Sequence, residues 1–180
     1  MPDDSGLIER TKAQHIVYQG RILTIRRDEV YLPDGREAFR ELVSHPGAVA
    51  VCALTEQNEV LLVRQFRYAY GEVLLEVPAG KLERGEDPFA AVQRELEEET
   101  GAAGTDWAYL GQYYSSVGFC DERIHFYKCR VTAMGAAHPD EDEYLHLVKM
   151  PLAEARQLVL DGKIPDGKSQ ALLLRVSVDS

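Results

Sequence analysis

The sequence predicts an α+β fold in which an antiparallel β-meander precedes a larger domain of strands and helices. Short runs rich in β-branched and aromatic residues, separated by glycine and proline, fill the segment from His15 to Val43. One helix with clear start and stop signals occupies the middle of the chain, and further strand-like and helical patterns follow it. We therefore expect two parts, a meander over residues 1–45 and a second domain over residues 46–180.

The segments before the central helix have the pattern of strands joined by turns. Residues 1–14 are polar and are expected to form a loose start. The break His45-Pro46-Gly47 is followed by a continuous apolar run, Ala48–Leu54, which is typical of a strand covered on both faces. Two more strands are expected before the helix, at Val60–Tyr68 and Val73–Val77.

The central helix is predicted from Pro88 to Thr100. Asp87 stands at its N-cap, Pro88 in its first turn, and Gly101 just beyond its last residue. After it we expect two strands, an acidic loop, a third strand, a helix, and a final segment that is either helix or strand. In that order they are Trp107–Tyr114, Ile124–Val131, Gly135–Glu143, Tyr144–Met150, Leu152–Leu160 and Ser169–Val176.

Composition narrows the class of protein. The formal net charge of −10 argues against a nucleic-acid partner, because proteins that bind nucleic-acid backbones carry basic patches. Cys52, Cys120 and Cys129 form no CxxC pair, which argues against a disulfide framework or a zinc site. The polar start and the absence of a long apolar run predict a cytoplasmic protein with no membrane partner.

The central helix carries clustered carboxylates. At about 100° per residue, Glu95, Glu98 and Glu99 fall within one arc of about 100°, while Glu97 faces the other way. The arc borders the apolar stripe of the helix, which is expected to be buried and comprises Phe89, Val92 and Leu96. On the helix alone, a solvated acidic face explains the pattern as well as a functional site does.

The placement of these carboxylates nevertheless favours a metal site. Like charges at this spacing repel each other, and anions near the C-terminus of a helix are disfavoured by the helix dipole. Divalent cations would offset both effects, and clustered carboxylates suit Mg²⁺, with Mn²⁺ as an alternative ion.

The surroundings of the helix resemble a known family. Gly80, Glu86 and the run Arg94-Glu95-Leu96-Glu97-Glu98-Glu99-Thr100-Gly101-Ala102 match every specified position of the Nudix box over 23 residues. The sequence therefore resembles Nudix hydrolases, which implies an α/β/α sandwich with a mixed sheet. The resemblance further implies that metal ions bind Glu95, Glu98, Glu99 and the carbonyl of Ala79. It also implies that Arg94 orients the glutamates and contributes to catalysis with Glu98, that Glu86 closes the loop onto the helix, and that Gly80 and Gly101 are structural.

Two further segments resemble ADP-ribose and nucleoside diphosphate sugar pyrophosphatases. They are Val63-Arg64-Gln65-Phe66-Arg67 and Leu75-Glu76-Val77-Pro78-Ala79-Gly80. The segment Arg40–Ala50, nearer the start of the chain, resembles the same enzymes. The resemblance implies cleavage of ADP-ribose to AMP and ribose 5-phosphate. In those enzymes a proline usually stands where this chain has Val117, so the substrate stays open. The alternatives are GDP-mannose, a dinucleoside polyphosphate or an oxidised nucleotide as substrate, or a regulator that binds a nucleotide sugar without cutting it.

The substrate-binding candidates include several arginines. The planar fork of Arg67 suits a phosphate. In the family the meander helps to build a homodimer in which both subunits line the base pocket, and this implies a role for Arg26, Arg27 and Arg40. Ordinary exposed arginines remain the alternative for each. Glu76 and Gly118 lie in the matching segments and complete the candidates.

The acidic loop is the last candidate segment. In the family a glutamate of this loop acts as general base, which implies Glu141 first and Glu143 second. A solvated acidic turn is the alternative.

Overall fold

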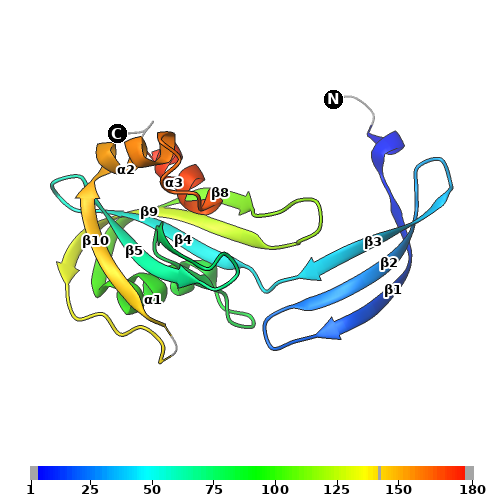
Figure 1. Ribbon diagram of the computed structural model, residues 1–180, viewed down its shortest axis with the longest axis horizontal. Helices are drawn as coiled ribbons and strands as arrows, with labels where there is room; N and C mark the ends of the chain where they lie inside the picture. Colours follow the sequence, from blue (N-terminus) through cyan, green and yellow to red (C-terminus); the bar gives the residue numbers. More distant parts are fainter. Residues whose placement is uncertain (1–3, 142, 177–180) are drawn as a thin grey trace. The chain divides into compact units, whose positions relative to one another are not determined.

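The computed structural model describes residues 4–141 and 143–176 of the chain (Figure 1). These residues form two compact units, of which the first comprises the chain up to Pro46 together with Tyr114–Glu122. The second unit comprises Gly47–Tyr113 and the chain from Arg123 onward. The association of Tyr114–Glu122 with the first unit is a long-range feature that the strand pattern does not reveal.

The first unit is built on a three-stranded antiparallel sheet in the order β1-β2-β3, as the sequence predicts (Figure 1). A 3₁₀ turn, η1, precedes the sheet, and the elements are η1 (Ser5–Leu7), β1 (Arg10–Gln19), β2 (Thr24–Tyr31) and β3 (Glu37–Ser44). The expected loose start is wrong beyond residue 9, because Arg10 and Thr11 pair with Tyr31 and Val30 of β2. The polar side chains of that segment are compatible with a strand whose residues are mostly exposed.

The second unit contains a seven-stranded mixed sheet in which β4 (Ala48–Leu54) is central. All seven residues of β4 are buried, as its continuous apolar run predicts. It runs parallel to β9 and antiparallel to β5 and β7. The main path of the sheet is β10-β5-β4-β9-β8, with β6 paired to β5. The other strands are β5 (Glu59–Arg67), β6 (Glu72–Glu76), β7 (Ala79–Lys81), β8 (Ala102–Tyr114), β9 (Arg123–Met134) and β10 (Leu145–Pro151).

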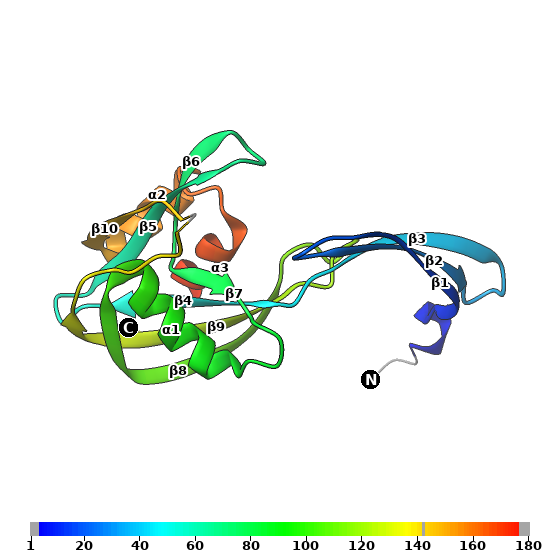
Figure 2. The same cartoon turned by 90° about the horizontal axis from the view of Figure 1, so that it is seen from below.

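Helices cover both faces of this sheet, which gives the predicted α/β/α sandwich (Figure 2). Residues of α1 (Pro88–Thr100) pack with Val49 and Val51 of β4 on one face. Residues of α2 (Leu152–Leu160) and α3 (Gly167–Val176) pack with the alternate residues of β4 on the other face. The last segment, which the sequence left as helix or strand, is therefore a helix whose apolar side completes the second core.

Helix α1 has the predicted boundaries. Asp87 Oδ1 accepts hydrogen bonds from the amides of Phe89 and Ala90 at 3.0 and 3.1 Å, and Gly101 ends the helix with a φ of +70°. Val92 and Leu96 are fully buried, but the expectation for Phe89 is wrong, since 42% of it is exposed. Its ring lies at the edge of the core, 5.7 Å from that of Trp107.

The three cysteines are free thiols. Cys52 and Cys129 belong to the cores on opposite faces of the sheet. Burial raises the pKa of each of these two thiols to about 12. Within the described ranges, no helix has the length and apolar content needed to cross a membrane.

Candidate active site

Strand β7 packs directly on helix α1. Gly80 lies so close to Glu95 that an added Cβ would stand 1.9 Å from the carboxyl carbon Cδ. One residue earlier, the amide of Ala79 donates a hydrogen bond to Glu99 Oε2 at 3.0 Å. Glycine at position 80 and the backbone of Ala79 therefore bring two carboxylates of α1 against the end of the sheet.

The glutamates of α1 differ in exposure as the helical spacing predicts. Glu95 and Glu99 are 8% and 4% exposed, Glu98 is half-buried and Glu97 is exposed. Burial raises the pKa of Glu95 to about 7 and that of Glu99 to about 8. Two adjacent buried carboxylates are costly in a folded protein unless a cation compensates them.

Arg94 holds the acidic cluster from one side. Its Nε and Nη2 donate to the two carboxylate oxygens of Glu86 at 3.0 and 3.1 Å. Its Nη1 lies 2.7 Å from Glu98 Oε2 and 2.9 Å from Glu95 Oε1. The hydrogen bonds to Glu86, followed by the charges of Glu95 and Glu98, raise the pKa of Arg94. A single guanidinium thus connects the loop that precedes α1 to two of its three clustered carboxylates.

The donor set at this cluster fits a hard divalent cation. Glu95, Glu98, Glu99 and the carbonyl of Ala79 supply only oxygen donors, which Mg²⁺ and Mn²⁺ prefer. In the part of the chain that the structure describes, no three acidic, histidine or cysteine side chains converge at metal-binding spacing. Arg94 Nη1 instead bridges Glu95 Oε1 and Glu98 Oε2.

The acidic loop after β9 is tied to the end of α1. The amide of His138 donates to the carbonyl of Glu98 at 2.8 Å. Within the loop, the amide of Glu143 donates to the carbonyl of Asp140 at 2.9 Å. The charge of Glu143 contributes to the raised pKa of both Glu95 and Glu99, which brings Glu143 into the electrostatic range of the cluster. Glu141 is exposed.

A second polar network lies at the end of β6. Arg67 donates two hydrogen bonds of 2.7 Å to the buried carboxylate of Glu76, from Nε to Oε1 and from Nη2 to Oε2. Lys168 of α3 also donates to Glu76 Oε2, and its ammonium lies 3.0 Å from Asp166 Oδ2. Sequence reasoning singled out Arg67 and Glu76 but missed Lys168 and Asp166. Asp166 precedes a helix, as a cap would, but no local signal links Lys168 to a strand end about ninety residues away.

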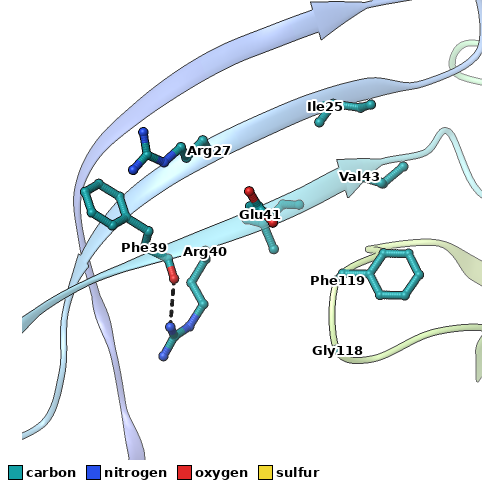
Figure 3. Close-up of a pocket in the computed structure, with 9 residues that line it drawn as sticks. Ile25, Arg27, Phe39, Arg40, Glu41, Val43, Gly118 and Phe119 are labelled. Atoms are coloured by element: carbon teal, nitrogen blue, oxygen red, sulfur yellow. Dashed lines mark hydrogen bonds between the residues drawn. The ribbon is translucent and has the colours of Figure 1, made fainter.

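The first unit contains a pocket of about 700 Å³ (Figure 3). Its lining includes two arginines, two aromatic rings and a glycine: Arg27, Arg40, Phe39, Phe119 and Gly118. The guanidinium of Arg27 lies over the Phe39 ring at 3.9 Å, and Arg40 pairs with Glu9. Arg26 is not among the residues that line this pocket. It contacts Asp28 and Ser44 instead.

Comparison with known proteins places this geometry in a family. The family model described as NUDIX domain matches residues 44–172, and the model described as nucleoside diphosphate sugar hydrolase N-terminal domain matches residues 9–43. A methanol dehydrogenase activator of Bacillus methanolicus is 41% identical over 89% of this chain and 88% of its own. An ADP-ribose pyrophosphatase of Bacillus subtilis is 36% identical over 91% of this chain and 90% of its own. The crystal structure of an ADP compounds hydrolase shares the fold, with a TM-score of 0.81 at 19% identity over 94% of this chain and 92% of that one. The chain therefore belongs to the Nudix hydrolase family.

Proposed function

We propose that the protein hydrolyses the diphosphate bond of ADP-ribose in a Mg²⁺-dependent reaction that gives AMP and ribose 5-phosphate. The observation that carries this proposal is the pair of buried carboxylates, Glu95 and Glu99, packed against the Ala79–Gly80 backbone. The relative named ADP-ribose pyrophosphatase supports the choice of substrate, since the likeness covers both the helix and the N-terminal segment.

The residues of the second unit would share the chemistry as follows. Mg²⁺ ions held by Glu95, Glu98, Glu99 and the Ala79 carbonyl would neutralise the diphosphate and make a water molecule more acidic. Arg94 keeps Glu95 and Glu98 oriented through its hydrogen bonds to Glu86. A loop carboxylate accepts the proton of the attacking water, and we propose Glu143 before Glu141 because only Glu143 contributes to the pKa of the clustered glutamates.

Each unit holds proposed substrate-binding residues. Arg67 is the proposed phosphate ligand, because its side chain remains 39% exposed while two of its nitrogens are fixed on Glu76. In the first unit, the stacked pair of Arg27 and Phe39 offers a flat surface for a purine, and Arg40 and Gly118 line the same pocket (Figure 3).

We also propose that residues 1–45 form a dimerisation element and residues 46–180 the catalytic domain. The strand β1 leaves consecutive apolar side chains exposed, and consecutive residues of a strand point to opposite faces of a sheet. Ile16, Val17 and Tyr18 are each more than half exposed. A second copy of the chain would cover such a strand. A cytoplasmic location remains a prediction of the sequence.

Other substrates and a second function are the alternatives to this proposal. Val117 is 82% exposed in the segment that carries Gly118, and it stands where ADP-ribose enzymes usually have proline. GDP-mannose, a dinucleoside polyphosphate and an oxidised nucleotide therefore remain the competing substrates. The relative named methanol dehydrogenase activator supports a second candidate function, in which the protein acts on an alcohol dehydrogenase. The complete set of box carboxylates favours hydrolysis in either setting.

A substrate panel tests the proposal. Purified protein is incubated with Mg²⁺, a phosphatase and one of several substrates: ADP-ribose, GDP-mannose, a dinucleoside polyphosphate or an oxidised nucleoside triphosphate. We expect the highest kcat/KM with ADP-ribose and no phosphate release in EDTA. Equal or faster release from GDP-mannose would replace the proposed substrate, and no release from any of them would remove the catalytic function.

A further inference from the structure

Four alternating charges link the start of helix α3 to the exposed edge of Arg67. Asp166 contacts Lys168 at 3.0 Å, Lys168 contacts Glu76 Oε2, and Glu76 contacts Arg67 through two hydrogen bonds of 2.7 Å. The chain of charges therefore begins with an anion and ends with a cation. All four residues belong to the second unit.

Exposure in this group is lowest at Glu76 and highest at Arg67. The side chain of Glu76 is 2% exposed, those of Lys168 and Asp166 are 14% and 18% exposed, and that of Arg67 is 39% exposed. Burial by itself raises the pKa of Glu76, but Arg67 and Lys168 outweigh it and the net direction is downward. Glu76 is thus a buried carboxylate shared by two cations, and only one of these cations retains a substantial surface.

The anionic end is compensated within its own helix. Asp166 Oδ2 accepts hydrogen bonds from the amide of Ser169 at 3.0 Å and from its hydroxyl group. The hydroxyl of Ser169 in turn accepts the amide of Val77 at 2.9 Å. Asp166 therefore caps α3, where the helix dipole also favours a negative charge, and the helix is fixed to the strand end that carries Glu76.

The cationic end is linked to α1 through the chain, because Glu76, the partner of Arg67, lies three residues before Ala79, whose amide donates to Glu99. The charge of Glu99 helps to raise the pKa of Arg67, after the larger effect of its hydrogen bonds to Glu76. Arg67 donates to Glu76 through Nε and Nη2. Its Nη1 has no hydrogen bond to any residue that the structure describes, so it is available for a ligand. In the proposed function, this nitrogen is the one that would contact the diphosphate.

We propose that Lys168 is a positioning residue that keeps the charge of Arg67 available for the substrate diphosphate. Lys168 compensates part of the charge of Glu76, so that Glu76 orients the guanidinium without fully neutralising it. Lys168 itself acts through Glu76 and does not touch the substrate. The inference rests on the proposed function, since it assigns a partner to the proposed phosphate ligand.

Different effects follow from removing Lys168 and from removing the charge of Asp166. In Lys168→Met, Glu76 has only Arg67 as counterion, so the affinity for a diphosphate falls by about tenfold. In Asp166→Asn, the helix cap persists because asparagine is also a good N-cap residue, and Lys168 compensates Glu76 more fully. We expect this second variant to bind the diphosphate equally or about twofold more tightly. A purely structural role would give no gain in Asp166→Asn and a loss in Lys168→Met that does not depend on Arg67.

The test measures binding without turnover. The α,β-methylene analogue of ADP-ribose is titrated in Mg²⁺ by calorimetry into the full chain and into its variants. We expect weaker binding in Lys168→Met, recovery in Lys168→Arg, and no change in the control Lys163→Met, whose lysine is exposed in the turn after α2. In an Arg67→Met background, Lys168→Met should cause less than a twofold further loss. In turnover assays the loss should appear in KM, with kcat within about threefold.

The outcomes separate the inference from the function on which it rests. Unchanged affinity in Lys168→Met, or an equal loss with and without Arg67, would overturn the role of Lys168 while leaving the proposed hydrolysis intact. Failure of the unmodified chain to bind the analogue would remove the proposed function, and this inference with it. If Lys168→Met does not fold, the direction of the change in Asp166→Asn decides, and a tenfold weaker affinity there would contradict the proposal.

Discussion

Gly80 acts through the space that it leaves for Glu95. Its φ is not in the left-handed region, so the backbone would accept alanine, and the obstacle is the carboxyl carbon of Glu95 at 1.9 Å from an ideal Cβ. The motif marks this glycine as required, and the structure gives the physical reason. Substitution of Gly80 by alanine must therefore displace the carboxylate of Glu95, a proposed metal ligand.

We predict that Gly80→Ala weakens Mn²⁺ binding by about tenfold or more, since displaced support around a ligand costs about 10–100-fold in metal affinity. The measurement is a Mn²⁺ titration followed by electron paramagnetic resonance. Gly71→Ala is the matched control, because Gly71 has a φ of +67° and no atom within 4 Å of its ideal Cβ. That control should lose stability but keep its Mn²⁺ affinity. Normal affinity in Gly80→Ala would contradict the account of this contact.

Some residues of the site follow from the sequence and others do not. The carboxylates of α1 were predictable because helical periodicity alone fixes their common face. Phe89 was assigned wrongly, because periodicity gives its direction but not the point at which the core ends. Lys168 was not predicted, because its role depends on a contact between α3 and β6 that no local pattern encodes.

At the scale of elements, α1 illustrates how far local signals reach. Asp87, Pro88 and Gly101 determine its boundaries, and the structure places each in the expected position. The final segment lacked a comparably clear signal, and tertiary packing determines its helical state, since Leu172 and Leu173 are fully buried in the second core. Local sequence signals thus predict α1, which carries the proposed metal ligands, better than they predict α3.

The cap of α1 gives a stability prediction. Asp87→Ala removes the acceptor for the amides of Phe89 and Ala90, and we expect the free energy of unfolding to fall by about 1 kcal/mol. Asp87→Asn should recover most of it, because asparagine accepts the same hydrogen bonds. Urea denaturation at neutral pH measures both variants. An alanine variant as stable as the original chain would show that this cap contributes nothing.

The anchor between β6 and α3 gives a pH prediction. The hydrogen bonds and charges of Arg67 and Lys168 hold the folded pKa of Glu76 below its ordinary value of 4.5, so its ion pairs contribute fully above the unfolded pKa. That stabilisation is lost as the pH falls through the folded value. We expect Glu76→Gln to be less stable than the original chain by about 3 kcal/mol at pH 7, because a partner of buried charges is removed.

The same difference should shrink as the pH falls below about 4.5, since Glu76 then gains a proton in the original chain. Thermal unfolding of both proteins across pH 3–8 measures the trend. A difference that stays constant over this range, or that grows at low pH, would contradict the assignment of Glu76 as the ionised centre of the network.

At the scale of the whole molecule, the meander and the α/β/α sandwich were predictable by different routes. The meander followed from short β-rich runs between turns, whereas the sandwich followed from the family resemblance. The inclusion of Tyr114–Glu122 in the first unit was not predictable, because it depends on the hydrogen bonds between Val43 and the segment from Phe119 to Asp121.

The proposed dimer is a prediction at this scale. The chain has a mass of 20.2 kDa, so twice this value, or about 40 kDa, is expected in sedimentation equilibrium. Ile16→Glu combined with Val17→Glu should shift the mass to that of one chain, because charges on an exposed apolar strand oppose its burial. Leu160→Glu, a similarly exposed position on α2, serves as control. A single-chain mass for the original protein would rule out the dimer.

The central claim is that the buried carboxylates of α1 hold a divalent cation against a diphosphate. The most direct test is the rate of ADP-ribose cleavage by Glu99→Gln in saturating Mg²⁺. Glutamine preserves the size of the side chain, so the fold should persist, as circular dichroism can verify. We predict a rate about 10²–10³-fold below that of the original chain, because a proposed metal ligand is lost at the reacting phosphate. An undiminished rate would contradict the claim.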